Sequence, residues 1–172
     1  LDFIQISGST SPALSDSVVY PRLYRVASSV GIVDAIVSFM EAAKWKRVSV
    51  YHNEQGLYFQ TIAQLLANAV LNDTTGNTLD NKGGLSPHID ESVVEGILNA
   101  PRIKTNKITV IVGTEHQCAV FVCAAYRLGR RWPGYVYILP NRDVADLQAT
   151  ALCDAQTMVK AIEGVFTVNV FQ

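Results

Sequence analysis

A loop rich in glycine and hydroxyl residues, SGSTSPALSD, spans Ser7–Asp16 and follows a short apolar run that is typical of a strand. A loop of this kind at the end of a strand brings backbone N–H groups and hydroxyls together in a small space. Convergent donors of that sort bind a carboxylate or a phosphate. The loop is therefore a candidate anion site, although an ordinary polar loop that caps a helix fits the same residues.

Metal binding is a second chemistry to consider. His52 and His116 each follow a predicted strand, and with Glu54 or Glu115 they have the ligand types that zinc takes. No fixed ligand spacing relates these residues, so we predict no metal site. The third histidine, His88, lies beside a proline in a loop and indicates no function.

Enzyme motifs are missing from the sequence. It contains no GxGxxG after a strand, no Walker loop and no GxSxG nucleophile elbow. The loop residues Ser9 and Ser11 have no evident base near them in the sequence. We therefore predict a chain that is not an enzyme and needs no cofactor.

The composition sets the broad class. The chain has 172 residues, of which 49% are hydrophobic and 17% are charged, and its net charge is −1. These values suit one domain, or one domain with a piece of another, and predict no nucleic-acid partner. The longest apolar run, Ala119–Tyr126, is far shorter than the roughly 20 residues that span a membrane. Because the sequence starts in a strand pattern without a signal peptide, we expect a soluble piece of a longer protein.

The cysteines and a sequon bear on the compartment. Cys118, Cys123 and Cys153 leave two possibilities open, namely reduced core thiols, or one disulfide and a free thiol. Asn72 begins the triplet Asn-Asp-Thr, an N-glycosylation sequon in a turn-like stretch. Since such triplets often arise by chance, the sequon favours an extracellular setting only weakly.

Periodicity predicts strands that alternate with helices. An apolar run such as ITVIV at Ile108–Val112 is typical of a strand buried on both faces, whereas Leu57–Leu71 has helical spacing. The predicted strands are Phe3–Ile6, Leu23–Val26, Val48–Tyr51, Ile108–Val112, Tyr135–Leu139 and Val165–Val170, and the predicted helices are Val30–Ala43, Leu57–Leu71, Glu91–Asn99, His116–Leu128 and Val144–Leu152. Asn72–Gly84 is predicted to be a long loop with a short edge strand near Thr78–Leu79.

This order predicts an α/β fold with a mostly parallel sheet and helices on both faces. Ligands of such sheets bind at the carboxyl ends of the strands. The predicted ends lie at residues 7–11, 52–56, 113–116 and 140–143.

Four groups of residues resemble the ligand-binding region of class C G-protein-coupled receptors, most closely the metabotropic GABA (GABA-B-like) receptors. In chain order they are Ser9–Asp16 (STSPALSD) with Tyr20-Pro21 and Tyr24-Arg25, Lys44–Val48 (KWKRV), Val120–Tyr126 (VFVCAAY), and Cys153 with Ala161–Val165 (AIEGV). The wider superfamily, periplasmic binding protein type I, also includes natriuretic-peptide-receptor and glutamate-receptor ectodomains. The resemblance implies a two-lobed clamshell, or Venus flytrap, that closes on a small ligand.

The resemblance also implies a domain division. Residues 1–16 would be the end of lobe 1 with its ligand loop, residues 17–28 the hinge crossing and the entry to lobe 2, and residues 29–172 lobe 2. The parent protein would lie in the plasma membrane with this part outside the cell. It would pair with a receptor dimer partner and reach a G protein through a transmembrane part that this chain lacks.

By the same resemblance, lobe 1 grips the carboxylate of an amino-acid-like ligand through Gly8, Ser9, Thr10 and Ser11, and Thr10 is the best single candidate. On lobe 2 the resemblance places Thr114, Glu115 and Arg142 at the ligand.

Three positions depart from the GABA-binding subunit. Ala27 stands where that subunit has a histidine, Thr114-Glu115 where it has an aromatic residue, and Asn141-Arg142 where it has a tryptophan. The resulting charged rim, which includes Asp143, favours a ligand more polar than GABA, or a partner subunit that binds no ligand.

The resemblance pairs Cys123 with Cys153 in a disulfide and so leaves Cys118 free. Because the helical neighbours of Cys118 are apolar, we expect a buried, unreactive thiol. A bacterial-type solute-binding protein of the same fold remains an alternative, against which the cysteine pair and the sequon argue mildly.

Overall fold

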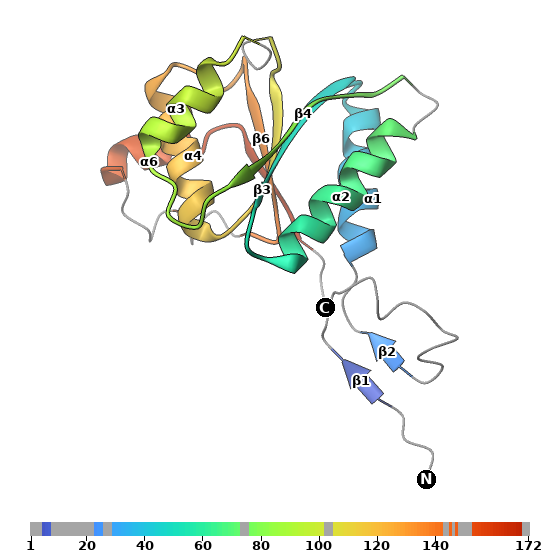
Figure 1. The fold of residues 1–172 in the computed structure, drawn as a ribbon. Coiled ribbons are helices and arrows are strands. Elements are labelled where there is room, and N and C mark those ends of the chain that lie inside the picture. Colours follow the sequence, from blue (N-terminus) through green and yellow to red (C-terminus); the bar gives the residue numbers. More distant parts are fainter. Residues whose placement is uncertain are drawn as a thin grey trace.

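The computed structural model describes residues 5–7, 23–25, 29–72, 76–101, 105–142, 145, 147 and 153–169. In chain order the elements are β1 (Gln5–Ser7), β2 (Leu23–Arg25), α1 (Ser29–Ala42), β3 (Arg47–Asn53), α2 (Leu57–Leu71), β4 (Thr78–Leu85), α3 (Glu91–Asn99), β5 (Ile108–Val112), α4 (Glu115–Arg127), β6 (Val136–Pro140), α6 (Ala155–Ala161) and β7 (Val165–Val168). Strands β1 and β2 pair in parallel as a separate two-stranded sheet (Figure 1).

The main sheet has five strands in the order β4-β3-β5-β6-β7, and every pair in it is parallel. All five carboxyl ends therefore lie at one edge of the sheet, and all five amino ends lie at the other. The predicted α/β fold class is confirmed.

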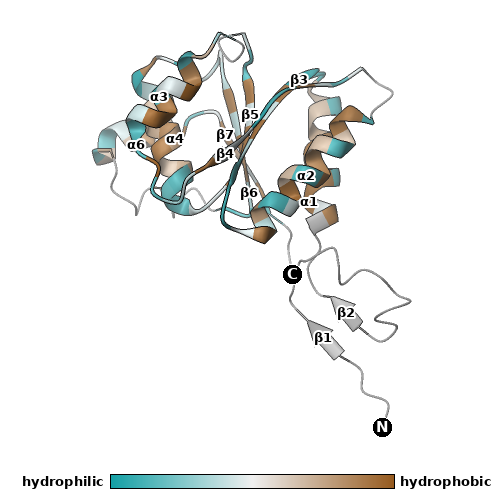
Figure 2. Ribbon diagram, viewed as in Figure 1, coloured by the Kyte–Doolittle hydropathy of each residue, from teal (hydrophilic) through white to brown (hydrophobic). Residues whose placement is uncertain are grey.

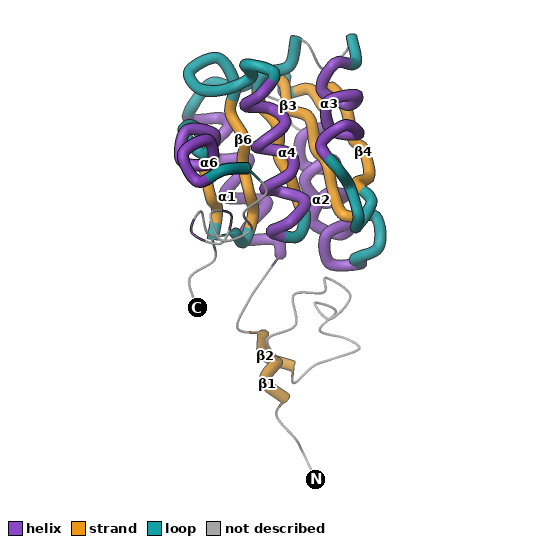
Figure 3. Tube along the Cα trace, turned by 90° about the vertical axis from the view of Figure 1, so that its left-hand side faces the viewer, coloured by secondary structure: helices purple, strands orange, loops and turns teal. Residues whose placement is uncertain are grey.

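Helices cover both faces of this sheet. Helices α1 and α2 pack on one face, and α3, α4 and α6 pack on the other (Figures 1 and 3). Alternate residues of β5 serve the two cores, because Val110 packs on the α1 and α2 side and Ile111 on the other. Because both of its faces are buried, β5 is an unbroken apolar run. The helices instead carry both brown and teal segments in Figure 2, as amphipathic helices do.

Side-chain caps fix where three helices begin. Asp90 accepts a hydrogen bond from the Val93 N–H at 3.0 Å at the start of α3, which has the predicted bounds Glu91–Asn99. Thr114 and Asp154 accept in the same way at the starts of α4 and α6. Each such cap stabilises its helix by about 1 kcal/mol, because it satisfies an N–H that has no partner inside the helix.

Two elements differ from the prediction. The stretch predicted as a loop with a short strand near Thr78–Leu79 contains the eight-residue strand β4, Thr78–Leu85. The helix α6, Ala155–Ala161, was not predicted. Of the predicted helix Val144–Leu152, only residues 145 and 147 are described, and both are helical.

The cysteines belong to one core. Cys123 of α4 forms a disulfide with Cys153, the pair that the resemblance indicated, with 6.2 Å between their Cα atoms. Cys118 is a free thiol that is 0% exposed, and burial raises its pKa to about 12. The expectation of a buried, unreactive Cys118 thus agrees with the structure. Among the described residues, no helix has the length and apolar character needed to cross a membrane.

Candidate ligand site at the carboxyl edge of the sheet

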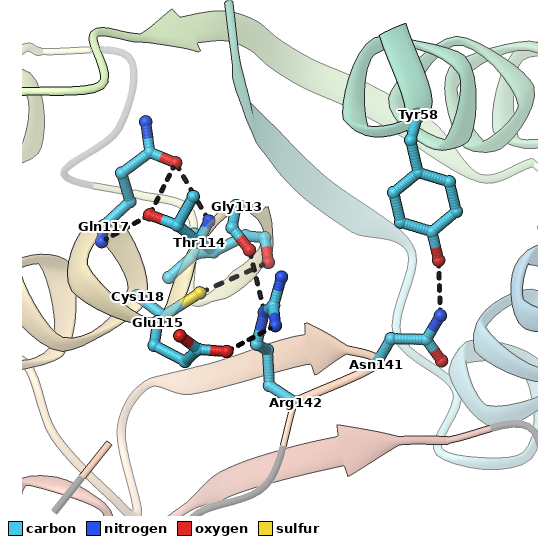
Figure 4. Close-up of polar contacts among 9 residues, drawn as sticks. Tyr58, Gly113, Thr114, Glu115, Gln117, Cys118, Asn141 and Arg142 are labelled. Carbon is cyan, nitrogen blue, oxygen red and sulfur yellow. Dashed lines mark hydrogen bonds and ion pairs between the residues drawn. The ribbon is translucent and has the colours of Figure 1, made fainter. Parts of the chain in front are cut away.

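Two neighbouring strands end side by side in polar residues. Strand β5 ends at Val112 and continues into Gly113 and Thr114, while the adjacent β6 ends at Pro140 and continues into Asn141 and Arg142. Since the strands are parallel, both turns lie at the same edge of the sheet (Figure 4).

Arg142 links these two turns. Its Nε donates to the Gly113 carbonyl at 2.8 Å, and its Nη1 donates to Glu115 Oε1 at 2.9 Å (Figure 4). The guanidinium carbon also lies 5.8 Å from the centre of the Phe59 ring, a cation–π distance. Three contacts, two from residues 113–115 and one from α2, therefore hold the Arg142 side chain in one orientation.

The two charges of this pair differ in exposure. The side chain of Arg142 is 18% exposed and that of Glu115 is 49% exposed. One Glu115 oxygen accepts from Arg142, and about half of the Glu115 side chain is exposed at the sheet edge. The pair thus presents an oriented carboxylate that has acceptor capacity left for a cationic group.

Thr114 is occupied in the fold. Its hydroxyl accepts from the Gln117 N–H and bonds Gln117 Oε1, both at 3.3 Å, and its own N–H donates to that Oε1 at 3.0 Å. This is a capping box, in which the two residues satisfy each other at the start of α4. A Cβ on Gly113 would lie 2.8 Å from Gln117 Oε1, so the glycine leaves room for the Gln117 side-chain amide to reach the Thr114 N–H. Thr114 therefore acts first as a helix cap.

Tyr58 and Asn141 belong to the same edge, although residue types and spacing alone gave Tyr58 no role at the site. The Asn141 side-chain amide donates to the Tyr58 hydroxyl, and the Asn141 N–H donates to the Val168 carbonyl at 2.9 Å. Burial raises the pKa of Tyr58, while the Asn141 hydrogen bond and the nearby Arg142 act in the opposite direction. The sequence did contain one indication of this role. Tyr58 lies in the first turn of α2, directly after the turn that follows β3, and this places it near the carboxyl edge of the sheet.

The histidines are not brought together. The ring Nδ1 of His52 bonds the Gly83 carbonyl at 2.8 Å, whereas His116 lines a cavity between α3 and α4 with Asp90 and Glu91. No group of three His, Cys, Asp or Glu side chains within the described part of the chain is arranged to hold a metal ion.

The remaining predicted site residues are either not described or lie elsewhere in the fold. Gly8, Ser9, Thr10 and Ser11, like Ala27 and Asp143, fall outside the described residues. Asn72 is exposed where α2 ends, and its N–H donates to the Asn68 carbonyl at 2.9 Å. Because α2 starts after the carboxyl end of β3 and runs back along the sheet, the sequon begins at the opposite edge.

The fold and its polar edge define an α/β lobe of the ligand-binding kind. The family model described as "Receptor family ligand binding region" matches residues 1–172, the whole chain, and the chain belongs to that family. Curated proteins give no significant match to it.

Proposed function

We propose that this chain is part of the extracellular ligand-binding domain of a class C, GABA-B-like receptor. In this proposal the main sheet and its helices form lobe 2, and the loop Gly8–Ser11 belongs to lobe 1. A small amino-acid-like ligand lies between that loop and the carboxyl edge of the sheet. Binding favours the closed clamshell over the open one, which is a shift between two populated states.

The observation that carries the proposal is the Glu115 carboxylate, half exposed at the carboxyl edge and oriented by Arg142 at 2.9 Å. An amino acid presents an ammonium group to such a carboxylate and its own carboxylate to the hydroxyl and N–H donors of the loop. Arg142 is a positioning residue here, because its guanidinium is already bound to Gly113 and Glu115. The charged pair suits a zwitterion better than an apolar ligand.

A thermal-shift screen of the full chain against amino acids and related small acids tests the proposal. We expect at least one zwitterion to raise the melting temperature, and Glu115→Gln and Thr10→Ala each to remove most of that shift. Glu163→Gln is the matched control, since Glu163 is exposed next to the amino end of β7. A shift that persists in Thr10→Ala contradicts the role of the loop, and one that persists in Glu115→Gln contradicts the role of the sheet edge.

A second candidate is a partner subunit that binds no ligand. It is favoured by the occupied state of Thr114, whose hydroxyl serves the α4 cap, and by the ion pair that already balances Glu115. Failure of every compound in the screen would support this candidate and contradict the first.

A further inference from the structure

The amino ends of the strands, at the edge opposite Arg142, line an open cavity of about 440 Å³. Three short segments that lead into β3, β5 and β6 form its walls, and they are residues 44–47, 105–108 and 132–136. Cavities that take small organic ligands have about 300–1,000 Å³. The space is therefore large enough for a molecule with one ring.

Positive charge dominates this cavity. Its described lining includes Lys44, Lys46, Arg47 and Lys107 and no acidic residue. The charge of Arg47 is balanced by Asp80, whose Oδ2 lies 2.9 Å from the Arg47 Nε. Lys44 and Lys107 are exposed and add positive charge to the lining, and such a site attracts an anion.

The cavity also has an aromatic wall. The chain contains two tryptophans, and both of them, Trp45 and Trp132, line the cavity. Each packs against Phe166, whose ring centre lies 6.2 Å from that of Trp45 and 6.5 Å from that of Trp132. Trp132 is 49% exposed. An indole this exposed offers a flat apolar surface to an aromatic ring.

The base of the cavity is held by buried hydrogen bonds. The Asn106 side chain is 3% exposed; its Nδ2 donates to Ser49 Oγ at 2.8 Å, and its Oδ1 accepts from the Ile108 N–H at 3.0 Å. The Val136 N–H donates to the Lys107 carbonyl at 2.7 Å. These bonds join the segments before β5 and β6 to each other and to β3, so the cavity is preformed.

From this juxtaposition of three lysines and two indoles around one preformed cavity, we infer a second ligand site, for a small aromatic anion such as a carboxylate or a phosphate monoester. The ring lies against Trp132 and Trp45, and the anionic group contacts Lys44 and Lys107. The exposed face of Trp132 favours a ligand with an aromatic ring over a polyanion that offers charge alone. The site is independent of the proposed amino-acid site at the other sheet edge.

Because both tryptophans line the cavity, tryptophan emission of the full chain reports on occupancy. Benzoate and phenyl phosphate are the probes, benzamide keeps the ring without the charge, and sulfate keeps the charge without the ring. We expect a saturable change in emission with at least one of the two probes. Benzamide should bind about tenfold more weakly or worse, because it loses the charge-assisted contact, and sulfate should do the same, because it has no ring to lie against the indoles.

Variants assign the binding to the cavity. Lys44→Gln combined with Lys107→Gln is expected to weaken binding of the responsive probe about tenfold, because the anionic group loses its charge-assisted contacts. Lys160→Gln is the matched control, because Lys160 is exposed on α6, which does not line the cavity, and it should leave binding unchanged. Both lysines of the pair are exposed, so the folded state tolerates the change.

Three results overturn the inference. They are equal binding of benzoate and benzamide, no saturable response to either anionic probe, and loss of binding in Lys160→Gln as large as in the double variant. A heparin oligosaccharide that binds through the same two lysines, while benzoate and phenyl phosphate do not bind, would replace the small-anion site with a polyanion surface.

Discussion

The side-chain amide of Gln117 donates to the backbone carbonyl of Leu85 at 3.1 Å, and so joins the first turn of α4 to the end of β4. The same nitrogen donates to the Ser86 carbonyl at 2.9 Å. Strand β3 lies between β4 and β5 in the sheet, so this amide reaches across the end of one strand. Gln117 is 0% exposed and thus stabilises the carboxyl edge from within.

Replacing Gln117 by Met keeps the length of the side chain and removes its polar groups. We expect the free energy of unfolding to fall by about 2–4 kcal/mol, because the α4 cap loses its partner and the carbonyls of buried Leu85 and of Ser86 lose a donor. Urea unfolding followed by circular dichroism measures this loss. Gln156→Met, at an exposed site on α6, is the control and should change stability by less than about 0.5 kcal/mol. Equal losses in the two variants would contradict the structural role of Gln117.

Arg142→Gln should cost more stability than Glu115→Gln. Loss of the guanidinium leaves the Gly113 carbonyl without its charged donor, at a cost of about 1.5–3 kcal/mol, whereas loss of the exposed Glu115 charge costs about 1 kcal/mol or less. Arg47→Gln is the control, since Arg47 is 54% exposed in its pair with Asp80. Chemical denaturation of the three variants ranks these effects, and a loss in Arg47→Gln as large as in Arg142→Gln would contradict the ranking.

Removal of the disulfide by Cys123→Ala with Cys153→Ala should lower the free energy of unfolding by about 3–4 kcal/mol in the chain-entropy model, for a sequence separation of 30. A reductant should destabilise the native chain and leave the double variant unchanged. Mass spectrometry without reduction should show the peptides with Cys123 and Cys153 linked. Alkylation of all three cysteines in the folded, unreduced chain would refute the pairing.

Stability should fall as the pH rises above the ordinary tyrosine pKa of 10.0. Burial raises the pKa of Tyr137, whose hydroxyl donates to the Arg130 carbonyl at 2.8 Å, so the folded state keeps a proton that the unfolded state releases. The contribution is fully present below pH 10 and is lost above it, by about 1.4 kcal/mol per pH unit for one proton.

Urea unfolding at several pH values between neutral and alkaline measures that slope. Tyr137→Phe removes one of several buried groups whose pKa is raised, and it should make the slope shallower by about 1.4 kcal/mol per pH unit. It should also lower stability at neutral pH by about 1 kcal/mol through the lost hydrogen bond. Tyr126→Phe serves as the control for loss of a tyrosine hydroxyl. A slope that is the same in the native chain and in Tyr137→Phe would show that Tyr137 is not responsible.

Elements with a strong local pattern could be predicted from the sequence. Ile108–Val112 and Leu57–Leu71 have the predicted bounds, because an apolar run buried on both faces and an amphipathic period of 3.6 are visible in the residues themselves. The capping residue Asp90 likewise fixed the start of α3.

Only the start of strand β4, near Thr78–Leu79, could be predicted, because most of its residues, TLDNKGGL, are polar and two are glycines. As an edge strand it pairs with β3 alone, and of its side chains only Leu85 is fully buried. Pairing with an existing neighbour therefore determines this strand, and no local preference reveals it.

The candidate site, like the fold, has a part that the sequence predicted and a part that it did not. The alternation of strands and helices predicted that the residues after β5 and β6 share one edge, and the structure places Glu115 and Arg142 together there. The contacts of Tyr58 with Asn141 and of Gln117 with Leu85 depend on how a helix packs over the sheet. Such packing is tertiary information that residue spacing does not contain.

All three cysteines of the chain lie in the core between the sheet and helices α3, α4 and α6, and the core under α1 and α2 has none. The sheet therefore separates a layer that responds to the redox environment from a layer that does not. Reduction loosens the tie between α4 and the segment before α6, and oxidants or alkylating agents that reach the interior act on that same layer.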